Sequence, residues 1–424
     1  MLDIQFIREH ADRIQLIAEQ KKMNVPIDEL LTIDVKRREF IQKIEGFRTK
    51  RNQETKQIAV LAKQQLKEEM EKKKTIVREL NQQIKGTESE LQEVEQRYKE
   101  LMNLVPNLVS SDTPVGDSDE DNVVLEHVGE PRSFSFKAQD HMELGLAHDM
   151  FDIERGVKVA GTRNYILKND GLFLHRAVQQ LAIDLLHERG FTMMDVPLMA
   201  NEEVLYSTGF FPTGKDQTYH LEKDNKYLVG TAEVPLVGYY GNEILEMSEP
   251  IKLAAVSNCF RREAGSAGRD VRGLYRVHQF AKVEQVIICK NDLALSDQIL
   301  TEITENAKEL MRLLELPYRV VAVCTGDMSQ KNYKQYDIET WMPSRGSYGE
   351  THSSSNVTDF QARRSNLRYR DEAGALHYCF TLNNTAVATP RILIPLLENH
   401  QQEDGSIYIP QALRKYMYGK AEIR

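Results

Sequence analysis

The sequence predicts an α+β protein in which a long antiparallel helical hairpin precedes an antiparallel β-sheet flanked by helices. Two observations support this. Residues 27 to about 105 contain only two glycines, and no proline lies between Pro26 and Pro106, which is typical of long helices and coiled coils. From about residue 122, short β-branched runs mix with helical segments and no regular strand-helix alternation dominates, which favours antiparallel pairing. We expect an N-terminal domain over residues 1–105 and a second domain over residues 106–424.

The hairpin is predicted from two series of apolar residues with heptad-like spacing. The first series consists of Phe40, Ile44, Phe47, Ile58 and Leu61, with polar Arg51 and Glu54 in its gap. The second consists of Val77, Leu80, Ile84, Thr87, Leu91, Val94, Tyr98 and Leu101. We expect the arms to join near residues 64–72. An arm of about 30 residues is roughly 45 Å long.

The charge of the chain is unevenly distributed. The formal net charge is −9, yet residues 36–100 carry 17 Lys and Arg against 12 Asp and Glu. A basic arm indicates a nucleic-acid partner, whereas a charge-rich coiled coil can also simply be solvated, and the charge alone leaves both interpretations open.

The segments around the arm are less regular. Within residues 3–22, Ile4, Ile7, Ala11, Ile14 and Ala18 share one helical face, which predicts a short helix at the base of the hairpin. Pro106, Pro114 and Gly116, followed by an acidic run, indicate a linker.

Composition also limits the class of protein. The four cysteines are widely separated and form no C-x-x-C pair, so neither a disulfide framework nor a cysteine zinc site is indicated. The N-terminus is charged, and no stretch approaches the roughly 18 apolar residues of a membrane span. We expect an untargeted cytoplasmic protein.

The second domain offers five predicted strands and two predicted helices. The strands are NVVLEHV at 122–128, IKLAAVSNCF at 251–260, YRVHQFAKVEQVIIC at 275–289, YRVVAVC at 318–324 and YDIETW at 336–341. The helices lie near 172–189 and 293–315.

One predicted strand has an unusual face. Alternation along it places Arg276, His278, Phe280, Lys282 and Glu284 on one side, and the apolar Val277, Ala281, Val283 and Ile287 on the other. The preceding strand places Cys259, Arg261 and Glu263 together. This face combines cations, an aromatic ring and carboxylates, which predicts a ligand-binding surface on the sheet. A surface hairpin with alternating charges would show the same pattern.

The segment 260–284, FRREAGSAGRDVRGLYRVHQFAKVE, resembles the second motif of class II aminoacyl-tRNA synthetases of the seryl type. In that family the motif begins F-R-x-E-A-G-S-A-G-R-D and ends H-Q-F-x-K-V-E. The resemblance extends over essentially the whole chain, through MLDIQFIREH at the start, the helical arm, GTAEVPL at 230–236, ETHSSSN at 350–356, DFQARR at 359–364 and LLENHQQEDGSIYIP at 396–410.

The resemblance implies the class II synthetase fold and a serine–tRNA ligase activity. L-serine and ATP would form seryl-adenylate and pyrophosphate, and serine would then pass to tRNA(Ser), and to tRNA(Sec), with release of AMP. It implies Mg²⁺ as well. Among the residues, it assigns catalytic roles to Arg261, Glu284 and Arg391.

The resemblance also assigns binding residues. Those for ATP are Arg261, Arg262, Glu263, Arg276, Val277, Phe280, Glu350, Thr351, His352, Ser353 and Arg391. Glu263 would accept from the adenine amino group, Phe280 would stack on the purine, and Arg276 and Arg391 would hold the outer phosphates. Glu350 and Ser353 would hold the metal. Those for serine are Thr231, Ala232, Glu233, Arg261, Glu284, Asn383 and Thr385.

Partners follow from the same resemblance. The hairpin would lie across the long variable arm of tRNA(Ser), and the loop within the second motif would meet its acceptor end. RGFTMMDVP at 189–197 resembles the first class II motif, whose proline, here Pro197, lies at a two-fold interface, so a homodimer is expected. We expect neither DNA nor a membrane as a partner.

The chain departs from the family pattern in its last motif. Where many bacterial members read N-G-S-G-L-A-x-G-R, this chain reads NNTAVATPR at 383–391. Thr389 and Pro390 suggest an N-cap and first residue of a helix, inside which Pro395 would cause a kink or mark an irregular turn. His352 stands where many relatives carry serine.

Two other functions are compatible with parts of the sequence. An amino acid:carrier-protein ligase would keep the adenylating site but lack the long basic hairpin. A non-catalytic paralogue would be expected to lose Arg261, Glu263, Glu284 or Arg391, and all four are present.

Overall fold

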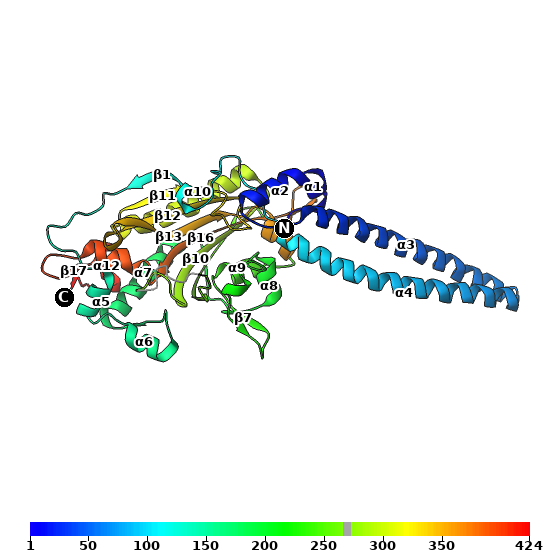
Figure 1. The fold of residues 1–424 in the computed structure, drawn as a ribbon, viewed down its shortest axis with the longest axis horizontal. Coiled ribbons are helices and arrows are strands. Elements are labelled where there is room, and N and C mark those ends of the chain that lie inside the picture. Colours follow the sequence, from blue (N-terminus) through cyan, green and yellow to red (C-terminus); the bar gives the residue numbers. More distant parts are fainter. Residues whose placement is uncertain (266–272) are drawn as a thin grey trace. The chain divides into compact units, whose positions relative to one another are not determined.

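The computed structural model describes residues 1–265 and 273–424. It divides into two compact units (Figure 1). One consists of Leu2–Glu19 and Met23–Val105, and the other of Met1, Gln20–Lys22 and Pro106–Arg424.

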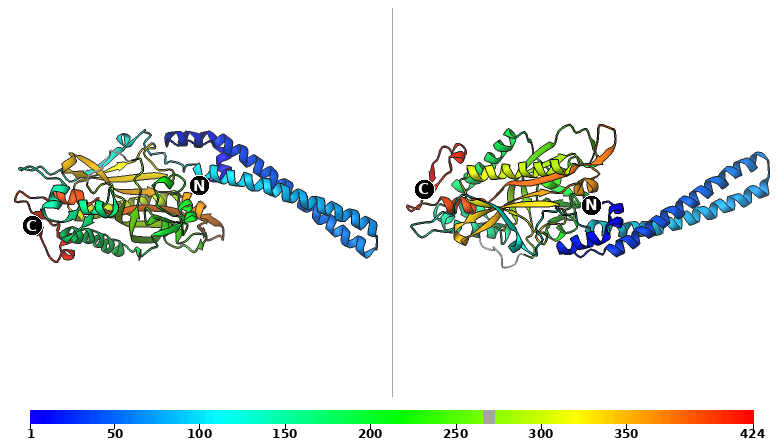
Figure 2. Two further views of the ribbon diagram at one scale, coloured as in Figure 1. Left: turned by 60° about the horizontal axis from the view of Figure 1, so that its bottom comes forward. Right: turned by 90° about the horizontal axis from the view of Figure 1, so that it is seen from above.

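The first unit is the helical hairpin. Helices α3 (Ile27–Lys63) and α4 (Lys67–Leu104) run antiparallel and stay side by side in every view (Figures 1 and 2). The connection is shorter than expected, since only residues 64–66 separate the helices, and Gln65 has a positive φ of 58°. The predicted seam is confirmed: Ile44, Leu80 and Ile84 are buried, as is Leu101, and the remaining seam positions are half-buried.

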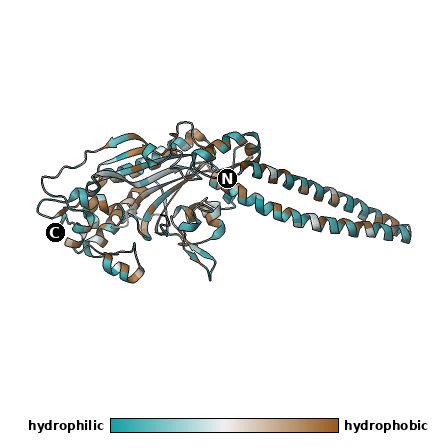
Figure 3. Ribbon diagram, viewed as in Figure 1, coloured by the Kyte–Doolittle hydropathy of each residue, from teal (hydrophilic) through white to brown (hydrophobic). Residues whose placement is uncertain are grey.

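Polar residues cover the rest of the hairpin, as the hydropathy colouring shows (Figure 3). Ion pairs join the two helices along their length: Arg97–Glu29 at 2.6 Å, Arg48–Glu88 at 2.8 Å and Lys73–Glu54 at 2.7 Å. These pairs fix which levels of α3 and α4 face each other.

The predicted helix over residues 3–22 is divided in two. Helix α1 (Ile4–Glu9) ends at His10, and α2 (Ala11–Gln20) follows directly. Ile7, Ile14 and Ala18 are buried as expected. Arg8 pairs with the buried Asp34 of α3 at 2.8 Å, which anchors α1 to the base of the hairpin.

The second unit is built on an eight-stranded sheet in the order β1-β11-β12-β13-β16-β10-β9-β4. Its strands are β1 (Val123–Val128), β4 (Thr192–Met194), β9 (Ile251–Phe260), β10 (Gln279–Cys289), β11 (Tyr318–Ala322), β12 (Lys334–Met342), β13 (Ser347–Asn356) and β16 (Phe380–Thr389). Every neighbouring pair is antiparallel except β4 with β9. The antiparallel sheet and all five predicted strands are confirmed, although β10 begins later than predicted.

Helices cover one face of this sheet. Helices α7 (Asn169–Glu188) and α10 (Leu293–Leu313), which match the two predicted ones, share one apolar core with Val283 and Ile287 of β10 and Leu382 and Val387 of β16. Because successive strand residues point to opposite faces, Lys282 and Glu284 of β10 face away from α7 and α10, whereas Gln285 shares the face of Val283 and donates to the Ile303 carbonyl of α10 at 3.0 Å. That opposite face carries the polar residues of the candidate site.

The last motif folds differently from expectation. Thr389 is the final residue of β16, and α12 (Leu393–His400) begins only at Leu393, so Thr389 is not its N-cap. Pro395 therefore lies in the first turn of α12, where a backbone N–H has no intrahelical partner, and no kink is required.

Shorter elements complete the second unit. The helices are α5 (His141–Ala147), α6 (Ile153–Ala160), α8 (Glu202–Ser207), α9 (Glu233–Gly238) and α11 (Phe360–Ser365), with 3-10 turns at Asp119–Asp121, Lys215–Gln217, Pro343–Arg345 and Gln411–Tyr416. The strands are β2 (Phe151–Asp152), β3 (Ile166–Leu167), β5 (Met199–Asn201), β6 (His220–Leu221), β7 (Lys226–Leu228), β8 (Ile244–Leu245), β14 (Arg368–Arg370), β15 (Leu376–Tyr378), β17 (Ile407–Tyr408) and β18 (Glu422–Ile423).

The state of the cysteines and the polarity of the helices bear on the expectations from composition. All four cysteines are buried and free. Within residues 1–265 and 273–424, no helix is long and apolar enough to cross a membrane.

Candidate active site

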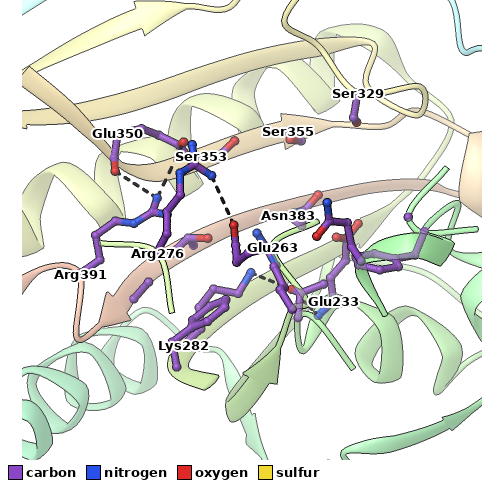
Figure 4. Close-up of a pocket in the computed structure, with 18 of the residues that line it drawn as sticks. Glu233, Glu263, Arg276, Lys282, Ser329, Glu350, Ser353, Ser355, Asn383 and Arg391 are labelled. Atoms are coloured by element: carbon purple, nitrogen blue, oxygen red, sulfur yellow. Dashed lines mark hydrogen bonds and ion pairs between the residues drawn. The ribbon is translucent and has the colours of Figure 1, made fainter. Parts of the chain in front are cut away.

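A cavity of about 710 Å³ lies over the polar face of the sheet (Figure 4). Strands β10, β13 and β16 contribute residues to its wall, as do loops that include residues 209–217 and 327–332. Most of the predicted site residues line it: Thr231, Glu233, Arg261, Glu263, Arg276, Val277, Phe280, Glu350, Thr351, Ser353, Asn383, Thr385 and Arg391. The fold thus brings together residues that are up to 160 positions apart in the sequence.

Four predicted residues do not line the cavity. Ala232 is fully buried and Arg262 is exposed. His352 is buried, and this burial lowers the pKa of its imidazole to about 3, so the ring is neutral at physiological pH. Glu284 is also fully buried, but its carboxylate contacts three residues that do line the cavity.

The predicted alternation fails at its first residues. Because β10 begins at Gln279, residues before it do not alternate with the strand, and His278 lines a separate small cavity with Tyr219 and Phe260. Likewise β9 ends at Phe260, so Arg261 and Glu263 follow the strand rather than belong to it. The part of this motif at residues 266–272 lies outside the described residues.

One end of the cavity holds a buried polar cluster around Glu284. Its carboxylate lies 2.6 Å from the Lys282 ammonium and accepts hydrogen bonds from Asn383 Nδ2 at 3.1 Å and Thr385 Oγ1 at 3.4 Å. A β-bulge after Val283 pairs Glu284 with Thr385 in the sheet register. Lys282 also donates to Thr231 Oγ1 at 2.7 Å. The cluster can bind a small molecule that carries both an amino and a hydroxyl group.

A second buried carboxylate, Glu233, lies at the start of α9. It forms an ion pair with Lys331 and accepts a hydrogen bond from Gln361 Nε2 at 2.7 Å. Lys331 belongs to an irregular loop, and no sequence pattern predicted its role. This pair ties the loop to the wall of the cavity.

Arg261 occupies the middle of the cavity wall. Its Nε donates to the Gly230 carbonyl at 3.3 Å, and its guanidinium lies 5.3 Å from the centre of the Phe280 ring. A Cβ at Gly230 would lie 2.9 Å from Phe210 Cζ and 3.6 Å from Arg261 Cγ, so glycine leaves room for this packing. The result is a fixed cation beside a half-buried aromatic ring.

Two further arginines line the opposite end (Figure 4). Arg276 lies 3.5 Å from the Glu263 carboxylate, and Arg391 lies 3.8 Å from that of Glu350. The Arg391 guanidinium also stacks on the Tyr275 ring at 4.4 Å, and Arg345 stacks on the same ring at 4.5 Å. Guanidinium groups held in this way suit phosphate oxygens.

Hard oxygen atoms gather near Arg391. Glu350 and Ser353 line the cavity. The neighbouring Asp337 and Asp327 have raised pKa values because of burial, to which the charge of Glu350 adds at Asp337 and those of Asp119 and Glu350 add at Asp327. Gln335 Nε2 donates to both Asp337, at 3.0 Å, and Ser353, at 3.1 Å. Within the described residues, no group of three or more His, Cys, Asp or Glu could hold a metal alone. This donor set fits Mg²⁺, which commonly takes one or two carboxylates and completes its shell with phosphate and water.

Comparisons with known proteins identify the family of the chain. The family described as "Seryl-tRNA synthetase N-terminal domain" matches residues 1–109, and "tRNA synthetase class II core domain (G, H, P, S and T)" matches residues 218–400. The serine–tRNA ligase of Deinococcus radiodurans is 43% identical over 99% of this chain and 98% of the relative. That of Thermomicrobium roseum is 42% identical over 100% and 95%.

Solved structures give the same result. The seryl-tRNA synthetase of Pyrococcus horikoshii, complexed with ATP, has a TM-score of 0.90 and 36% identity, and the match covers 100% of this chain and 99% of that one. The cytoplasmic serine–tRNA ligase of Naegleria fowleri, in complex with AMP, has a TM-score of 0.86 and 26% identity, with 100% and 99% coverage. With both family matches and full-length relatives above 30% identity, the chain belongs to the seryl-tRNA synthetase family.

Proposed function

We propose that this protein is a serine–tRNA ligase, which activates L-serine with ATP and transfers it to tRNA(Ser) and tRNA(Sec). The observation that carries the proposal is the single cavity that joins the Glu284 cluster to the arginines Arg261, Arg276 and Arg391. One end suits an amino acid with a hydroxyl side chain, and the other suits a triphosphate. The relatives named above support the same activity.

ATP lies along the arginine side of the cavity in this proposal. The purine stacks on Phe280 and donates its amino hydrogens to Glu263, while Arg276 and Arg391 hold the outer phosphates. In the structure these two arginines pair with Glu263 and Glu350. ATP would therefore exchange ion pairs within the protein for contacts with phosphate and adenine.

Serine lies at the Glu284 cluster. Its hydroxyl and ammonium groups meet Glu284 and Thr385, with Asn383, Thr231 and Glu233 around them. Alanine lacks the hydroxyl group, so it would leave a buried polar group without a hydrogen-bond partner, which disfavours it.

The chemistry needs no covalent enzyme intermediate. The serine carboxylate attacks the α-phosphorus and pyrophosphate leaves; the terminal ribose hydroxyl of tRNA then attacks the seryl carbonyl and AMP leaves. Arg261, which lines the cavity beside Phe280, would contact both the carboxylate and the α-phosphate, and its charge would stabilise the negative charge that develops between them. Positioning and charge supply the catalysis.

Mg²⁺ belongs to the same proposal. Glu350 and Ser353 would hold it. When bound, the cation would neutralise charge on the ATP phosphates.

We assign tRNA binding to the helical hairpin and to the loop of the second motif. The hairpin carries the excess of basic residues over 36–100, in a chain whose net charge is −9. Phosphate contacts by Lys and Arg supply most of the sequence-independent affinity for nucleic acid. The loop residues 266–272 lie outside the described residues. No DNA partner is proposed.

A homodimer in the cytoplasm completes the proposal. Strand β4 is one of the two edge strands of the sheet. After it in the chain, Pro197 and Met199 are exposed, and Met199 is 57% exposed. An edge strand beside exposed apolar side chains favours a further interface. Free, buried cysteines agree with a reducing compartment.

Serine-dependent exchange of pyrophosphate into ATP, followed by charging of tRNA(Ser), tests the proposal. We expect both activities. A protein that exchanges pyrophosphate but charges no tRNA would be an amino acid:carrier-protein ligase instead. A protein that does neither would be a non-catalytic paralogue.

A further inference from the structure

Gln217 is a cavity residue to which neither the sequence motifs nor the resemblance assigns a role. It ends the 3-10 turn Lys215–Gln217, and this turn is held by hydrogen bonds to the Gly214 carbonyl from Gln217 N, at 3.1 Å, and Thr218 Oγ1, at 2.8 Å. Its side chain lines the same cavity as Glu263. Gln217 therefore projects from a fixed turn towards the site.

Gln217 makes three hydrogen bonds to the backbone on the two sides of Glu263. Its carbonyl accepts from Arg262 N at 2.8 Å. Its side-chain amide makes two bonds to Ala264: Nε2 donates to Ala264 O at 2.7 Å, and Oε1 accepts from Ala264 N at 3.0 Å. This paired contact imitates the exchange of hydrogen bonds between neighbouring β-strands.

The contact begins where the sheet stops supporting this segment. Arg261 N still donates to His278 O at 3.0 Å, and His278 Nδ1 donates to Arg261 O at 3.0 Å, so Arg261 continues the pairing of β9 with the β10 side. From Arg262 onward the partner is Gln217. From Arg262, the residue before Glu263, Gln217 therefore provides the backbone hydrogen bonds that the neighbouring strand provides up to Arg261.

Glu263 needs such support because its backbone conformation is unfavourable. Its φ is +51°, in the left-handed region that residues with a Cβ rarely adopt. In this conformation its carboxylate lies 3.5 Å from Arg276 Nη1, within the cavity. The direction of the carboxylate therefore depends on a backbone that Gln217 holds on both sides.

We propose that Gln217 is a positioning residue that sets the selectivity of this enzyme for a purine with a 6-amino group, by holding Glu263 in its left-handed conformation. The inference rests on the proposed function, in which Glu263 accepts from that amino group. A carboxylate fixed in place gains a hydrogen bond from adenine and gains none from a purine that lacks the group. A carboxylate on a backbone that is not held in place discriminates less between adenine and a purine without the 6-amino group.

The test compares ATP with purine riboside triphosphate, which carries hydrogen in place of the 6-amino group. Binding of each nucleotide is measured by calorimetry, and kcat/KM of each by serine-dependent pyrophosphate exchange. In Gln217→Ala we expect the binding affinity and kcat/KM to fall about tenfold for ATP and by less than about twofold for the analogue. One good polar contact ordinarily contributes about a tenfold change. The ratios of affinity and of kcat/KM between ATP and the analogue therefore fall, while KM for serine stays constant.

A second variant separates the two bonds to Ala264. Gln217→Glu keeps an acceptor for Ala264 N but loses the donor to Ala264 O and places a carboxylate beside it. We expect a loss of discrimination at least as large as in Gln217→Ala. The matched control is Asp216→Ala, one residue earlier, exposed and outside the cavity lining, which should leave the ratio unchanged.

The outcomes are distinct. Equal losses for both nucleotides, or an unchanged ratio in both folded Gln217 variants, would overturn the inference and leave Gln217 as an ordinary structural residue. If the wild-type protein showed no pyrophosphate exchange, the proposed function would be wrong, and the binding ratio measured by calorimetry would still decide the role of Gln217.

Discussion

The Lys282 ammonium lies 2.6 Å from the Glu284 carboxylate, and the side chains are only 7% and 0% exposed. The two residues are neighbours on one face of β10, so the strand itself places a buried ion pair at the serine end of the cavity. Removing one member of a buried pair leaves the other charge without compensation, which costs about 3–5 kcal/mol. This relationship makes the serine end sensitive to single substitutions.

Glu284→Ala should weaken the use of serine far more than the use of ATP. We expect KM for serine in pyrophosphate exchange to rise about 100-fold, corresponding to about 3 kcal/mol, with KM for ATP changed by less than about threefold. Glu403→Gln, at an exposed carboxylate, is the control. Equal losses for both substrates would show that Glu284 does not act at the serine end.

Lys331→Met should disturb both stability and serine use, because it removes the cation that pairs with the buried Glu233. We expect a lower melting temperature and about a tenfold higher KM for serine. The double variant Lys331→Met/Glu233→Gln has no unpaired charge and should recover the melting temperature but not the serine KM. If the double variant melts below Lys331→Met, the two residues are not coupled in this way.

Tyr275 should act through its ring rather than its hydroxyl group. The guanidinium groups of Arg345 and Arg391 lie 4.5 and 4.4 Å from the centre of the ring, whereas the hydroxyl donates to the Glu350 carbonyl at 3.2 Å. We expect Tyr275→Leu to raise KM for ATP about tenfold and Tyr275→Phe to raise it less than about threefold, since each cation–π contact contributes about 0.5–2 kcal/mol. Similar effects of both variants in steady-state kinetics would contradict this assignment.

Shortening the hairpin should separate adenylate formation from tRNA charging. Arg48 and Glu88 face each other across α3 and α4, so residues 49–87 can be replaced by a short glycine-rich turn at this level. We expect unchanged pyrophosphate exchange and a loss of tRNA(Ser) charging of at least about 100-fold. Loss of exchange in a folded variant would refute this division of labour.

A charge variant provides a milder version of the same test. Changing Lys72, Lys73 and Lys74 to Gln should raise KM for tRNA and reduce its dependence on salt, whereas changing Glu68, Glu69 and Glu71 to Gln should not raise it. Equal effects of the two triple variants would favour a structural role for the hairpin charges.

His175 should make stability depend on pH. Burial within α7 lowers the pKa of its imidazole from 6.5 to about 4, so the unfolded chain binds a proton in this interval and the folded chain does not. Stability therefore falls as pH decreases from 6.5 to about 4, by up to about 1.4 kcal/mol per pH unit. Thermal unfolding between pH 7.5 and 5 should show a shallower slope for His175→Gln than for the wild-type protein.

The control for this experiment is His187→Gln, at an exposed histidine of the same helix. It should retain the wild-type slope. A His175→Gln variant with the wild-type slope would mean that other groups set the pH dependence.

Much of the fold and of the site could be predicted from local patterns. The seam of the hairpin depends on spacing along single helices, and the strands on β-branched runs, so Ile44, Leu80 and Ile84 are buried as expected. The second motif predicts Arg261, Glu263 and Phe280 as site residues and the last motif predicts Arg391, and all four line the cavity.

Other features could not be predicted because they depend on where elements end and on which distant segments meet. The start of β10 at Gln279 places His278 outside the main cavity, and the extension of β16 to Thr389 delays α12. Lys331 belongs to an irregular loop and Gln217 to a single 3-10 turn, and neither segment has a periodic sequence pattern. Only the folded chain brings these residues to Glu233 and Ala264.

By itself, the sequence determined the helical hairpin, the antiparallel sheet and the family to which the chain belongs, because repeat spacing and motif order are properties of the linear chain. The tertiary structure alone decided that Glu284 is a buried residue paired with Lys282, that Gln217 supports Glu263, and that a single cavity joins the carboxylate cluster to the arginines. The reason is physical: burial and hydrogen-bond partners depend on contacts between segments far apart in sequence, and no local pattern specifies them.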